Sequence, residues 1–509
     1  MNQHPLHSQS AHPAPSRKSR VAIIGSGLAG LTTAYLVNHD DLKRYEVTLF
    51  EQADSLSLDA ASVTVENTKT GNAERVDVPP RSFCRGYYNN LCRMYDYLGI
   101  AFQPIRLIWV YTKTSATAQH PGHAPTAEDA DAMPGSYFVY GRRLHEMLLL
   151  SPSFWGSSFK QILQTFYLAV CHIWFFAACL LLQPLASSPS ENSAAAKRLH
   201  NCESFGEYLE RIRLPRQYVT YYLLPVLSVI CSCSHAEMMD FPASDVTAFM
   251  MGSFLQRTYV SRGGINKVQS MLSKGIQNIR LNTRVTKVQR VDEGVLVCWE
   301  SRKGEKVTTS EEIFDRVVLA VSPNVAAAIF SPSKALLSAI PTVPVTTSIT
   351  APPSAGISLK HETGPVPSGE CSYHSGRPQV MEFRTTFSDK SARSESFHFL
   401  PSGMVVRSSP CDLTAESKGK LKVSKFTRTL RTTQSRSTVQ RIMRIDKPAY
   451  NSELQWENGA GTETWVNGKD NVWITGSWCW DGLVLLEGCV VSAMKVARDF
   501  GVSVPWDEE

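Results

Sequence analysis

The feature that most constrains the fold of this chain is an apolar run that leads into a glycine-rich turn close to the N-terminus. Residues 21–24 are apolar, and residues 25–30 have the spacing G-x-G-x-x-G. A second apolar run at 46–50 ends in Glu51, about 20 residues beyond the last glycine. Strand, glycine turn, helix, strand and acidic residue therefore follow one another in the order of a dinucleotide-binding βαβ unit.

Each glycine of this turn has a separate expected task. Gly25 permits a tight turn, Gly27 lets the backbone approach a pyrophosphate, and Gly30 lets the helix pack closely against the strand. The amides of Leu28 and Ala29 at the start of the helix would face the phosphates, where the helix dipole favours negative charge. The carboxylate that ends the second strand can accept hydrogen bonds from a ribose diol. The simpler alternative is a glycine-rich turn in an ordinary α/β sheet.

Length, charge and cysteine content narrow the function classes. A chain of 509 residues can hold two or three domains, or one enzyme with interleaved domains. The net charge of +6 is spread along the chain, which predicts no nucleic-acid partner. The 12 cysteines do not suggest a disulfide scaffold. Cys231, Cys233 and His235 lie close together but lack the second ligand pair of a zinc site, so no metal is expected.

The first 20 residues are polar and rich in His, Ser and Pro, without the apolar core of a secretory signal. They are expected to form a disordered tail. We therefore expect an intracellular protein, either cytoplasmic or associated with a membrane.

Regular elements are predicted along the rest of the chain. Alternating patterns indicate strands at 107–111 and 136–140, and residues 203–257 have a helical pattern that prolines interrupt. Residues 407–437 contain few large apolar side chains and are expected to be partly disordered. Further strands are predicted at 279–290, 294–300, 314–321, 379–387, 396–399 and 404–406.

A second glycine turn lies near the C-terminus. The apolar run 472–474 is followed by Gly476, and a helix is predicted to begin near Glu487 and Gly488. Free amides at that helix N-terminus would point at whatever lies above it. With this element the chain resembles the flavin-containing amine oxidoreductases, a family that includes monoamine and polyamine oxidases and phytoene-desaturase-like enzymes.

The resemblance extends to two internal stretches. Residues 262–285 are similar to a family run that ends in a valine whose backbone contacts adenine, here Val285. Residues 314–323 are similar to the family's D.VI.A.P strand. The resemblance implies an α/β fold, with a Rossmann-like FAD-binding domain that is discontinuous in sequence and an α+β substrate domain. It also implies that the first glycine turn holds the ADP half of FAD, and the second holds the ribityl chain and the flavin ring.

The resemblance therefore gives a set of residues expected to bind FAD noncovalently. They are Gly25, Gly27, Leu28, Ala29, Gly30, Glu51, Gln52, Arg81, Val285, Gly476, Glu487 and Gly488.

Several positions depart from the family pattern. After the acidic residue the family usually has Gly-Gly-Arg, whose arginine meets the pyrophosphate, whereas this chain has LSLDAAS at 56–62. Arg81 or Arg85 is expected to supply the positive charge instead, a plain surface arginine being the alternative. The covalent flavin cysteine of monoamine oxidases precedes the final strand, whereas Cys479 follows it, so covalent attachment is not expected.

Aromatic and acidic residues surround the expected flavin ring. Trp478 and Trp480 are expected to line the substrate pocket, with structural packing as the alternative. Asp481 and Glu487 lie nearby in sequence, and a capping role is expected for Glu487. No general base can be named from the sequence.

These motifs identify a cofactor more surely than a reaction. We expect a two-electron oxidation, desaturation or isomerisation of an apolar small molecule, lipid-like or terpenoid-like, with molecular oxygen or another electron acceptor. The alternatives are a flavin amine oxidase that acts on small amines and a non-catalytic flavin-fold binding protein. An NAD-dependent dehydrogenase is disfavoured, because ordinary dehydrogenases do not close their dinucleotide site with the last helix of the chain.

Residues 162–182 are apolar and long enough to cross a bilayer. A single crossing would separate residues 21–51 from the other two segments of the expected FAD site, so it contradicts a shared site. Two crossings would need 218–233 to return, and that stretch is short and broken by Pro225. We therefore expect an in-plane or re-entrant contact with a membrane surface, with a buried helix of the substrate domain as the alternative.

The expected domain organisation follows from these assignments. It consists of a disordered tail (1–19), a first FAD-binding segment (20–100), substrate-domain strands (101–160), the apolar helix (161–183), a helical cap or substrate domain (184–260), a second FAD-binding segment (261–330), a substrate-domain sheet with flexible excursions (331–460) and a third FAD-binding segment (461–509).

Overall fold

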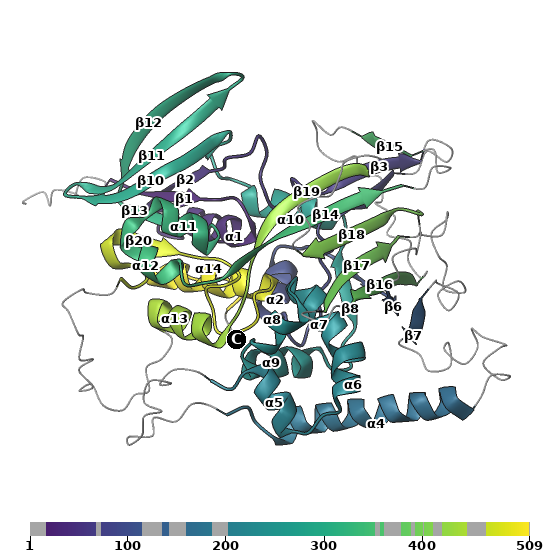
Figure 1. Ribbon diagram of the computed structural model, residues 1–509. Coiled ribbons are helices and arrows are strands. Elements are labelled where there is room, and N and C mark those ends of the chain that lie inside the picture. Colours follow the sequence, from purple (N-terminus) through teal and green to yellow (C-terminus); the bar gives the residue numbers. More distant parts are fainter. Residues whose placement is uncertain are drawn as a thin grey trace, which may run out of the picture.

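The computed structural model is built on a parallel sheet whose strands come from distant regions of the chain (Figure 1). It describes residues 17–67, 73–114, 135–141, 159–185, 202–351, 357–360, 378–387, 392–400, 402–410, 420–444 and 465–507. The parallel sheet has the order β20-β13-β1-β2-β9. Its strands are β1 (Ser19–Ile24), β2 (Tyr45–Phe50), β9 (Asn278–Arg280), β13 (Arg316–Leu319) and β20 (Val472–Ile474). The expected α/β fold with a Rossmann-like domain is confirmed.

The central strand of this sheet is apolar on both faces because both faces are covered. Val21 and Ile23 face a core that also contains α1 (Leu28–Asn38), α10 (Gly264–Ser273) and α14 (Leu486–Asp499). Ala22 and Ile24 face a second core that contains α11 (Pro323–Ile329) and α13 (Thr433–Met443). Burial on both sides explains why the strand has a continuous apolar run rather than an alternating pattern.

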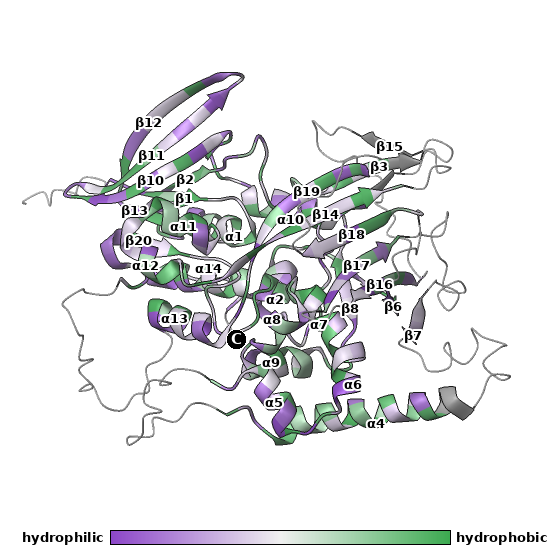
Figure 2. Cartoon of the chain, viewed as in Figure 1, coloured by the Kyte–Doolittle hydropathy of each residue, from purple (hydrophilic) through white to green (hydrophobic). Residues whose placement is uncertain are grey.

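An antiparallel three-stranded sheet extends from one side of the parallel sheet (Figure 1). It contains β10 (Thr283–Val291), β11 (Gly294–Lys303) and β12 (Lys306–Phe314). The sequence did not predict β12, because most of its residues are exposed and hydrophilic (Figure 2) and give no apolar alternation. The strand is held by its pairing with β11 along its whole length.

A mixed seven-stranded sheet forms the second half of the molecule, in the order β19-β14-β18-β17-β16-β6-β7. Its strands are β6 (Leu107–Lys113), β7 (Ser136–Gly141), β14 (Thr342–Thr350), β16 (Gln379–Thr386), β17 (Arg393–Phe399), β18 (Val405–Pro410) and β19 (Lys420–Thr429). The strands predicted at 107–111, 136–140 and 379–387 are confirmed. The disorder expected within 407–437 is wrong for the described residues 420–437, which form β19 and the start of α13.

Two smaller sheets join the halves. One contains β3 (Val63–Asn67), β4 (Ala73–Val76) and β15 (Ile357–Lys360), and the other pairs β5 (Phe102–Ile105) with β8 (Thr258–Ser261).

Helices cover one end of the seven-stranded sheet. They are α2 (Asn89–Tyr97), α4 (Phe159–Leu181), α5 (Phe205–Arg211), α6 (Arg216–Tyr218), α7 (Leu224–Cys231), α8 (His235–Met239) and α9 (Ala243–Ser253), with a π-helical turn at Val219–Leu223. Pro215 and Pro242 are N-cap residues and Pro225 lies in the first turn of α7, positions where the missing amide of proline is not needed.

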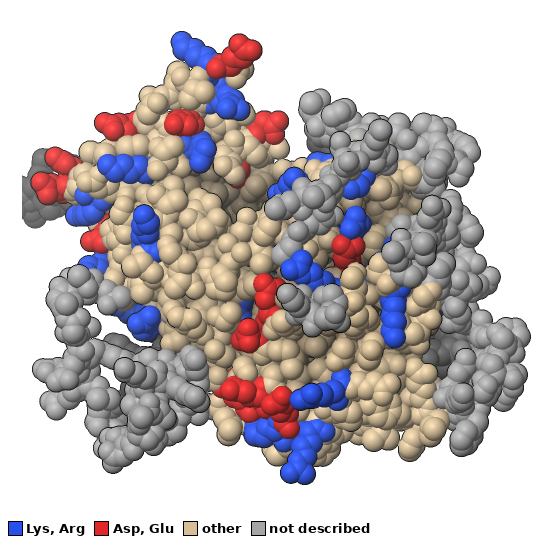
Figure 3. Space-filling model, in the orientation of Figure 1, with Lys and Arg blue, Asp and Glu red and all other residues tan. Residues whose placement is uncertain are grey.

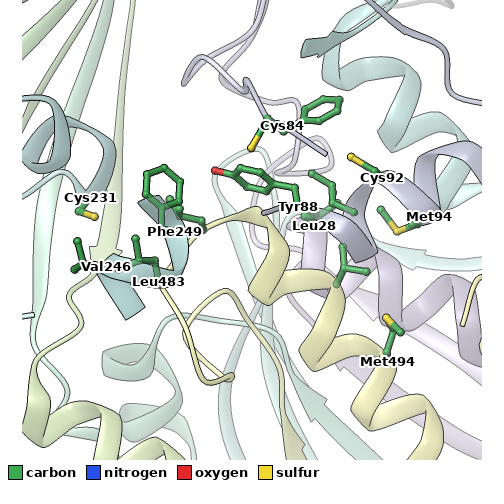
Figure 4. Packing of buried hydrophobic residues seen from close by; sticks show 14 of the residues in the cluster. Leu28, Cys84, Tyr88, Cys92, Met94, Cys231, Val246, Phe249, Leu483 and Met494 are labelled. Carbon is green, nitrogen blue, oxygen red and sulfur yellow. The ribbon is translucent and has the colours of Figure 1, made fainter. Parts of the chain in front are cut away.

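One apolar core joins these helices to the parallel-sheet half (Figure 4). Tyr88, just before α2, lies between Leu28 of α1 and Phe249 of α9, and Leu483 approaches from the loop before α14. The two halves are therefore packed through a shared interior.

Candidate functional site

The carboxyl ends of four parallel strands meet at one edge of the five-stranded sheet. The Gly25–Gly27 turn follows β1, Glu51 follows β2, Ala320 follows β13, and Gly476 lies two residues after β20. Backbone hydrogen bonds hold this edge together, from Gly25 N to Phe50 O (2.9 Å) and from Ala320 N to Ile24 O (2.8 Å). Ligands of open α/β sheets bind at this edge.

The three glycines of the first turn meet different surroundings. Gly25 has a φ of +103°, and a Cβ there would lie 2.6 Å from the carbonyl oxygen of Ala320. A Cβ at Gly30 would overlap the carbonyl oxygen of Gly25. By contrast, a Cβ at Gly27 would meet no atom within 4 Å. Packing explains Gly25 and Gly30, whereas only a ligand that approaches the backbone explains the open space at Gly27.

Two helix N-termini point into the same region. α1 and α14 pack against each other, and neither has a side chain that caps its first amides. Leu28 and Ala29 are buried in the first turn of α1. Cys489 lies in the first turn of α14, where the Ala29 amide and Arg81 stabilise its thiolate, although burial dominates and raises its pKa to about 11. The partial positive charges of both N-termini suit an anionic group such as a pyrophosphate.

Glu51 is buried next to the first turn. Its carboxylate accepts hydrogen bonds from Ser26 Oγ (2.5 Å), from the Ser26 amide (3.2 Å) and from the Ala53 amide (3.0 Å). The adjacent Gln52 is exposed. The backbone of Glu51 pairs with the chain that leads into β10, through Thr283 N to Glu51 O at 2.8 Å, and this places the buried Val285 on the neighbouring strand.

Arg81 is half-buried and faces the N-terminus of α14. One Nη donates to the carbonyl of Leu58 (3.0 Å), while Nε is shielded from solvent and has no hydrogen-bond partner in the described residues. Burial lowers the pKa of Arg81, and the nearby Asp77 opposes this shift. Burial likewise raises the pKa of Asp77 to about 6. Arg85 is exposed instead, and its guanidinium pairs with Asp96 at 3.1 Å.

The second glycine turn is held by a serine that sequence reasoning missed. Ser492 Oγ of α14 accepts a hydrogen bond from Gly476 N (3.0 Å) and lies 2.9 Å from Thr475 Oγ1. A Cβ at Gly476 would lie 2.9 Å from Trp478 Nε1, and one at Gly488 would overlap the Trp480 indole. Both glycines are therefore required by the packing of tryptophans.

Glu487 acts as the cap of a neighbouring helix. Its carboxylate accepts hydrogen bonds from the amides of Asn90 (2.8 Å) and Leu91 (3.0 Å) and from Asn90 Nδ2 (2.7 Å), at the start of α2. Burial raises the pKa of Glu487, and the hydrogen bonds from Leu91 and Asn90 oppose the shift. The side chain is fully engaged with the protein, as the sequence suggested, so a contact with a cofactor would come from its backbone.

The two tryptophans differ in their surroundings. Trp478 is buried in the second core, with Nε1 3.3 Å from the carbonyl oxygen of Val321. Trp480 is half-buried against Gly488, and the Tyr87 ring lies 6.1 Å from it, centroid to centroid. Tyr87 also packs against Phe249 at 4.9 Å.

Two arginines hold the loop that carries these tryptophans. Arg431 donates to the carbonyls of Trp478 (3.1 Å) and Trp480 (2.8 Å). Arg436 forms ion pairs with the buried Asp245 (3.1 Å) and with Asp481 (2.7 Å). The Asp481 carboxylate is therefore engaged in an ion pair.

A small cavity of about 30 Å³ lies where the seven-stranded sheet meets the loop after β4. Its walls are mainly apolar, with side chains such as Val76, Leu107 and Met381, and its polar lining includes Arg81 and His398. His398 Nε2 lies 2.7 Å from Gln379 Oε1. Burial lowers the pKa of His398 to about 4, so the imidazole is neutral at pH 7.

The structure adds residues that the sequence did not single out. Ser26, Ser492 and Tyr87 carry no motif signal, because their roles depend on which distant strand ends meet. His398 and Arg428 lie in the segment that matches no family pattern, and Arg428 approaches Arg81 and Cys489 from β19. Only the three-dimensional packing of the two halves reveals them.

No group of three or more potential metal ligands occurs in the region of the chain that the structure describes. His235 Nε2 lies 2.8 Å from Ser394 Oγ, and Cys233 is buried next to the sulfur of Met238. These contacts give the C-x-C-x-H stretch a structural role.

Comparisons with known proteins match two regions of the chain. The NAD(P)-binding Rossmann-like domain profile matches residues 23–98, and the flavin containing amine oxidoreductase profile matches residues 156–392. No curated protein matches the chain in sequence.

Solved structures resemble the fold at low sequence identity. A fatty acid isomerase from P. acnes that produces CLA is 12% identical, with a TM-score of 0.52 over 96% of this chain and 100% of that one. Cyclohexylamine oxidase from Brevibacterium oxydans is 12% identical, with a TM-score of 0.48 over 95% of this chain and 100% of that one.

The open space at Gly27 predicts a separation between folding and cofactor binding. Gly27→Val should abolish FAD binding, because the side chain fills the space over the turn, while the apoprotein keeps its circular dichroism spectrum. Gly30→Ala should instead destabilise the apoprotein by about 1–3 kcal/mol in urea unfolding, because the methyl group collides with the Gly25 carbonyl. Wild-type FAD affinity in Gly27→Val would contradict this assignment.

The geometry of Arg81 predicts a contribution to cofactor affinity. Arg81→Gln should weaken FAD binding by roughly 10- to 100-fold in a titration of apoprotein, the scale for one lost charged hydrogen bond. The matched variant Arg85→Gln removes an exposed arginine that pairs with Asp96, and its affinity should be unchanged. Equal affinities for the two variants, with both proteins folded, would show that Arg81 has no such role.

Proposed function

The chain belongs to the flavin-containing amine oxidoreductase superfamily and is a FAD-dependent oxidoreductase, and we propose that it binds FAD noncovalently and oxidises, desaturates or isomerises an apolar small molecule. The observation that carries the cofactor proposal is the open cradle at Gly27 between two uncapped helix N-termini. The observation that carries the substrate proposal is the mainly apolar cavity between the cradle half and the seven-stranded sheet.

The residues at the cradle fit a flavin dinucleotide. The amides of Leu28 and Ala29 and the guanidinium of Arg81 would hold the pyrophosphate, and Glu51 would accept hydrogen bonds from the ribose. The backbone at Gly476 and Gly488 would hold the other end of the cofactor. A bound flavin supplies the two-electron acceptor, and the protein binds it and orients the substrate.

Noncovalent attachment is supported by the position of the cysteines. Cys479 packs in the second core next to Trp478, and burial raises the pKa of its thiol well above the ordinary value. A buried, protonated thiol is a poor nucleophile, so it is not suited to form a bond to the flavin. Cys489 is also protonated at pH 7.

The cavity favours an apolar substrate with at most one polar group. Neutral His398, held by Gln379, offers a hydrogen bond without the cost of burying a charge. The aliphatic walls exclude water from the remaining surface. Molecular oxygen or another electron acceptor would complete the cycle where the reaction is a net oxidation.

A small amine is the second candidate substrate, and one observation favours it. Tyr87, Trp480 and Phe249 form an aromatic group beside Gly488. Aromatic faces attract cations, so this group could receive an ammonium or the amine formed from it.

Anaerobic reduction of the flavin tests the proposal. The purified holoprotein is mixed with a panel of fatty acids, terpenoids, sterols and small amines, and bleaching of the flavin absorbance is recorded. Because an isomerisation leaves no net reduced flavin, the products from the apolar compounds are also analysed by mass spectrometry and chromatography. We expect bleaching or product from an apolar compound, and loss of this activity in Met381→Trp, which fills the cavity.

The control is the FAD content of Met381→Trp, which should equal that of the wild type. Bleaching by small amines alone would replace the proposed substrate with the second candidate. A holoprotein that gives neither bleaching nor product with any compound would favour a non-catalytic binding protein.

A further inference from the structure

Helix α4 presents a continuous apolar stripe to the outside of the protein. Its segment Leu163–Leu181 is long and apolar enough to cross a membrane, with a mean hydropathy of 1.6. Large apolar side chains are exposed along it at intervals of three or four residues, which places them on one face. These residues are Leu163, Phe166, Val170, Ile173, Trp174, Leu180 and Leu181.

The opposite face of α4 belongs to the interior of the protein. Leu168, Cys171, Phe175, Ala178 and Cys179 are buried in the same core as the first turn of α1. A helix that is apolar all round normally has apolar surroundings on every side. Here the protein supplies them on one side only.

The polar side chains of α4 are turned toward the protein rather than toward water. Gln164 Nε2 donates to Tyr222 Oη (2.8 Å), His172 Nδ1 lies 2.9 Å from Tyr218 Oη, and Trp174 Nε1 donates to the carbonyl of Ile212 (2.9 Å). A surface helix in water has the reverse arrangement, with its polar groups facing outward. Satisfying these groups internally leaves a face that suits hydrocarbon.

A second element extends the same apolar surface. The loop after α9 carries Phe254 and Leu255, and the Phe254 ring lies 4.3 Å from that of Phe176 on α4. Leu255 is 82% exposed and has a φ of +54°, a conformation that large side chains rarely adopt. The backbone thus holds an apolar side chain outward, beside the stripe.

The charges around this surface show which partner it fits. Figure 3 shows few charged side chains over α4, which lies along the lower edge of the molecule. The exposed Arg213 and Arg216 follow the Ile212 carbonyl that binds α4, and Arg257 follows Leu255. None of these three arginines has an ion pair among the described residues, although Glu207 and Glu210 of α5 are also exposed. Guanidinium groups at the edge of an apolar surface suit lipid phosphates.

We propose that α4 and the Phe254–Leu255 loop dock the protein on a phospholipid bilayer, with α4 lying in the plane of the membrane. The buried stripe ties α4 to the core that contains α1 and α14, so the helix contacts lipid along its outer face without leaving the protein. A flat helix of this kind inserts about 5–10 Å, to the boundary of headgroups and acyl chains. This proposal is independent of the substrate.

Vesicle co-sedimentation of the full-length holoprotein tests the proposal. Vesicles of phosphatidylcholine, and of phosphatidylcholine with a quarter phosphatidylserine, are used at physiological salt. The protein should bind to both, and more tightly to the anionic vesicles. The double variant Phe166→Ser with Ile173→Ser removes side chains that are 66% and 69% exposed, and its binding should fall at least tenfold.

The matched control is Leu42→Ser with Val307→Ser, which removes side chains that are 72% and 51% exposed but lie away from α4. Its vesicle binding should equal that of the wild type. FAD content and circular dichroism of both double variants verify that the fold is kept.

Leu255→Asn gives a second test with little risk to the fold, because Asn adopts the left-handed conformation more readily than Leu. Its vesicle binding should fall several-fold. Absence of wild-type binding to either vesicle would overturn the proposal, as would unchanged binding in both α4 and Leu255 variants. A wild-type dimer that dissociates in the Phe166 and Ile173 variant, without vesicle binding, would assign the stripe to a second copy of the chain instead.

Discussion

The structure depends on the close approach of the first helix to two neighbouring strands. Gly25 and Gly30 leave no space between α1, β1 and β13, and side chains at either position would collide with carbonyl oxygens at this crossing. The tight crossing sets the direction of α1, so that its first amides point over the sheet edge. Gly27 is free of such packing, and its open space is the feature that identifies a ligand site.

Three separate regions of the chain must fold together before this site exists. The parallel sheet takes β1 and β2 from the first region, β9 and β13 from the second and β20 from the third. Ser492 fixes the turn after β20, and Glu487 fastens α14 to α2. Because these ties join residues that are far apart in the sequence, the site and the fold are formed by the same interactions.

The sequence predicted the cradle well because local chemistry controls it. A glycine turn, an acidic strand end and a helix start are encoded within about 30 residues, the length of one βαβ unit. The long excursions between β14 and β20 were less predictable. β12 has no apolar alternation, and β19 and α13 lie in a polar stretch whose order comes from pairing with β14 and from burial of residues such as Val439 and Ile442.

Side-chain roles at the site were the least predictable aspect. Hydropathy could not show that Arg81 is shielded while Arg85 is solvent-exposed, because the chain between them is irregular and has no periodic pattern. The neutral His398 and the pair of Tyr87 with Trp480 arise only where the two halves meet. The apolar stretch at 162–182 is half-buried in α4, so neither a complete span nor a fully buried helix describes it.

The central claim is that this chain holds FAD noncovalently at the Gly27 cradle, and acid release of flavin tests it most directly. The purified protein is precipitated with acid, and the flavin in the supernatant is identified by chromatography and measured against protein concentration. The account predicts close to one FAD per chain in the supernatant and none left in the pellet. A folded protein that contains no flavin and does not bind added FAD, or a flavin that stays in the pellet, would contradict it.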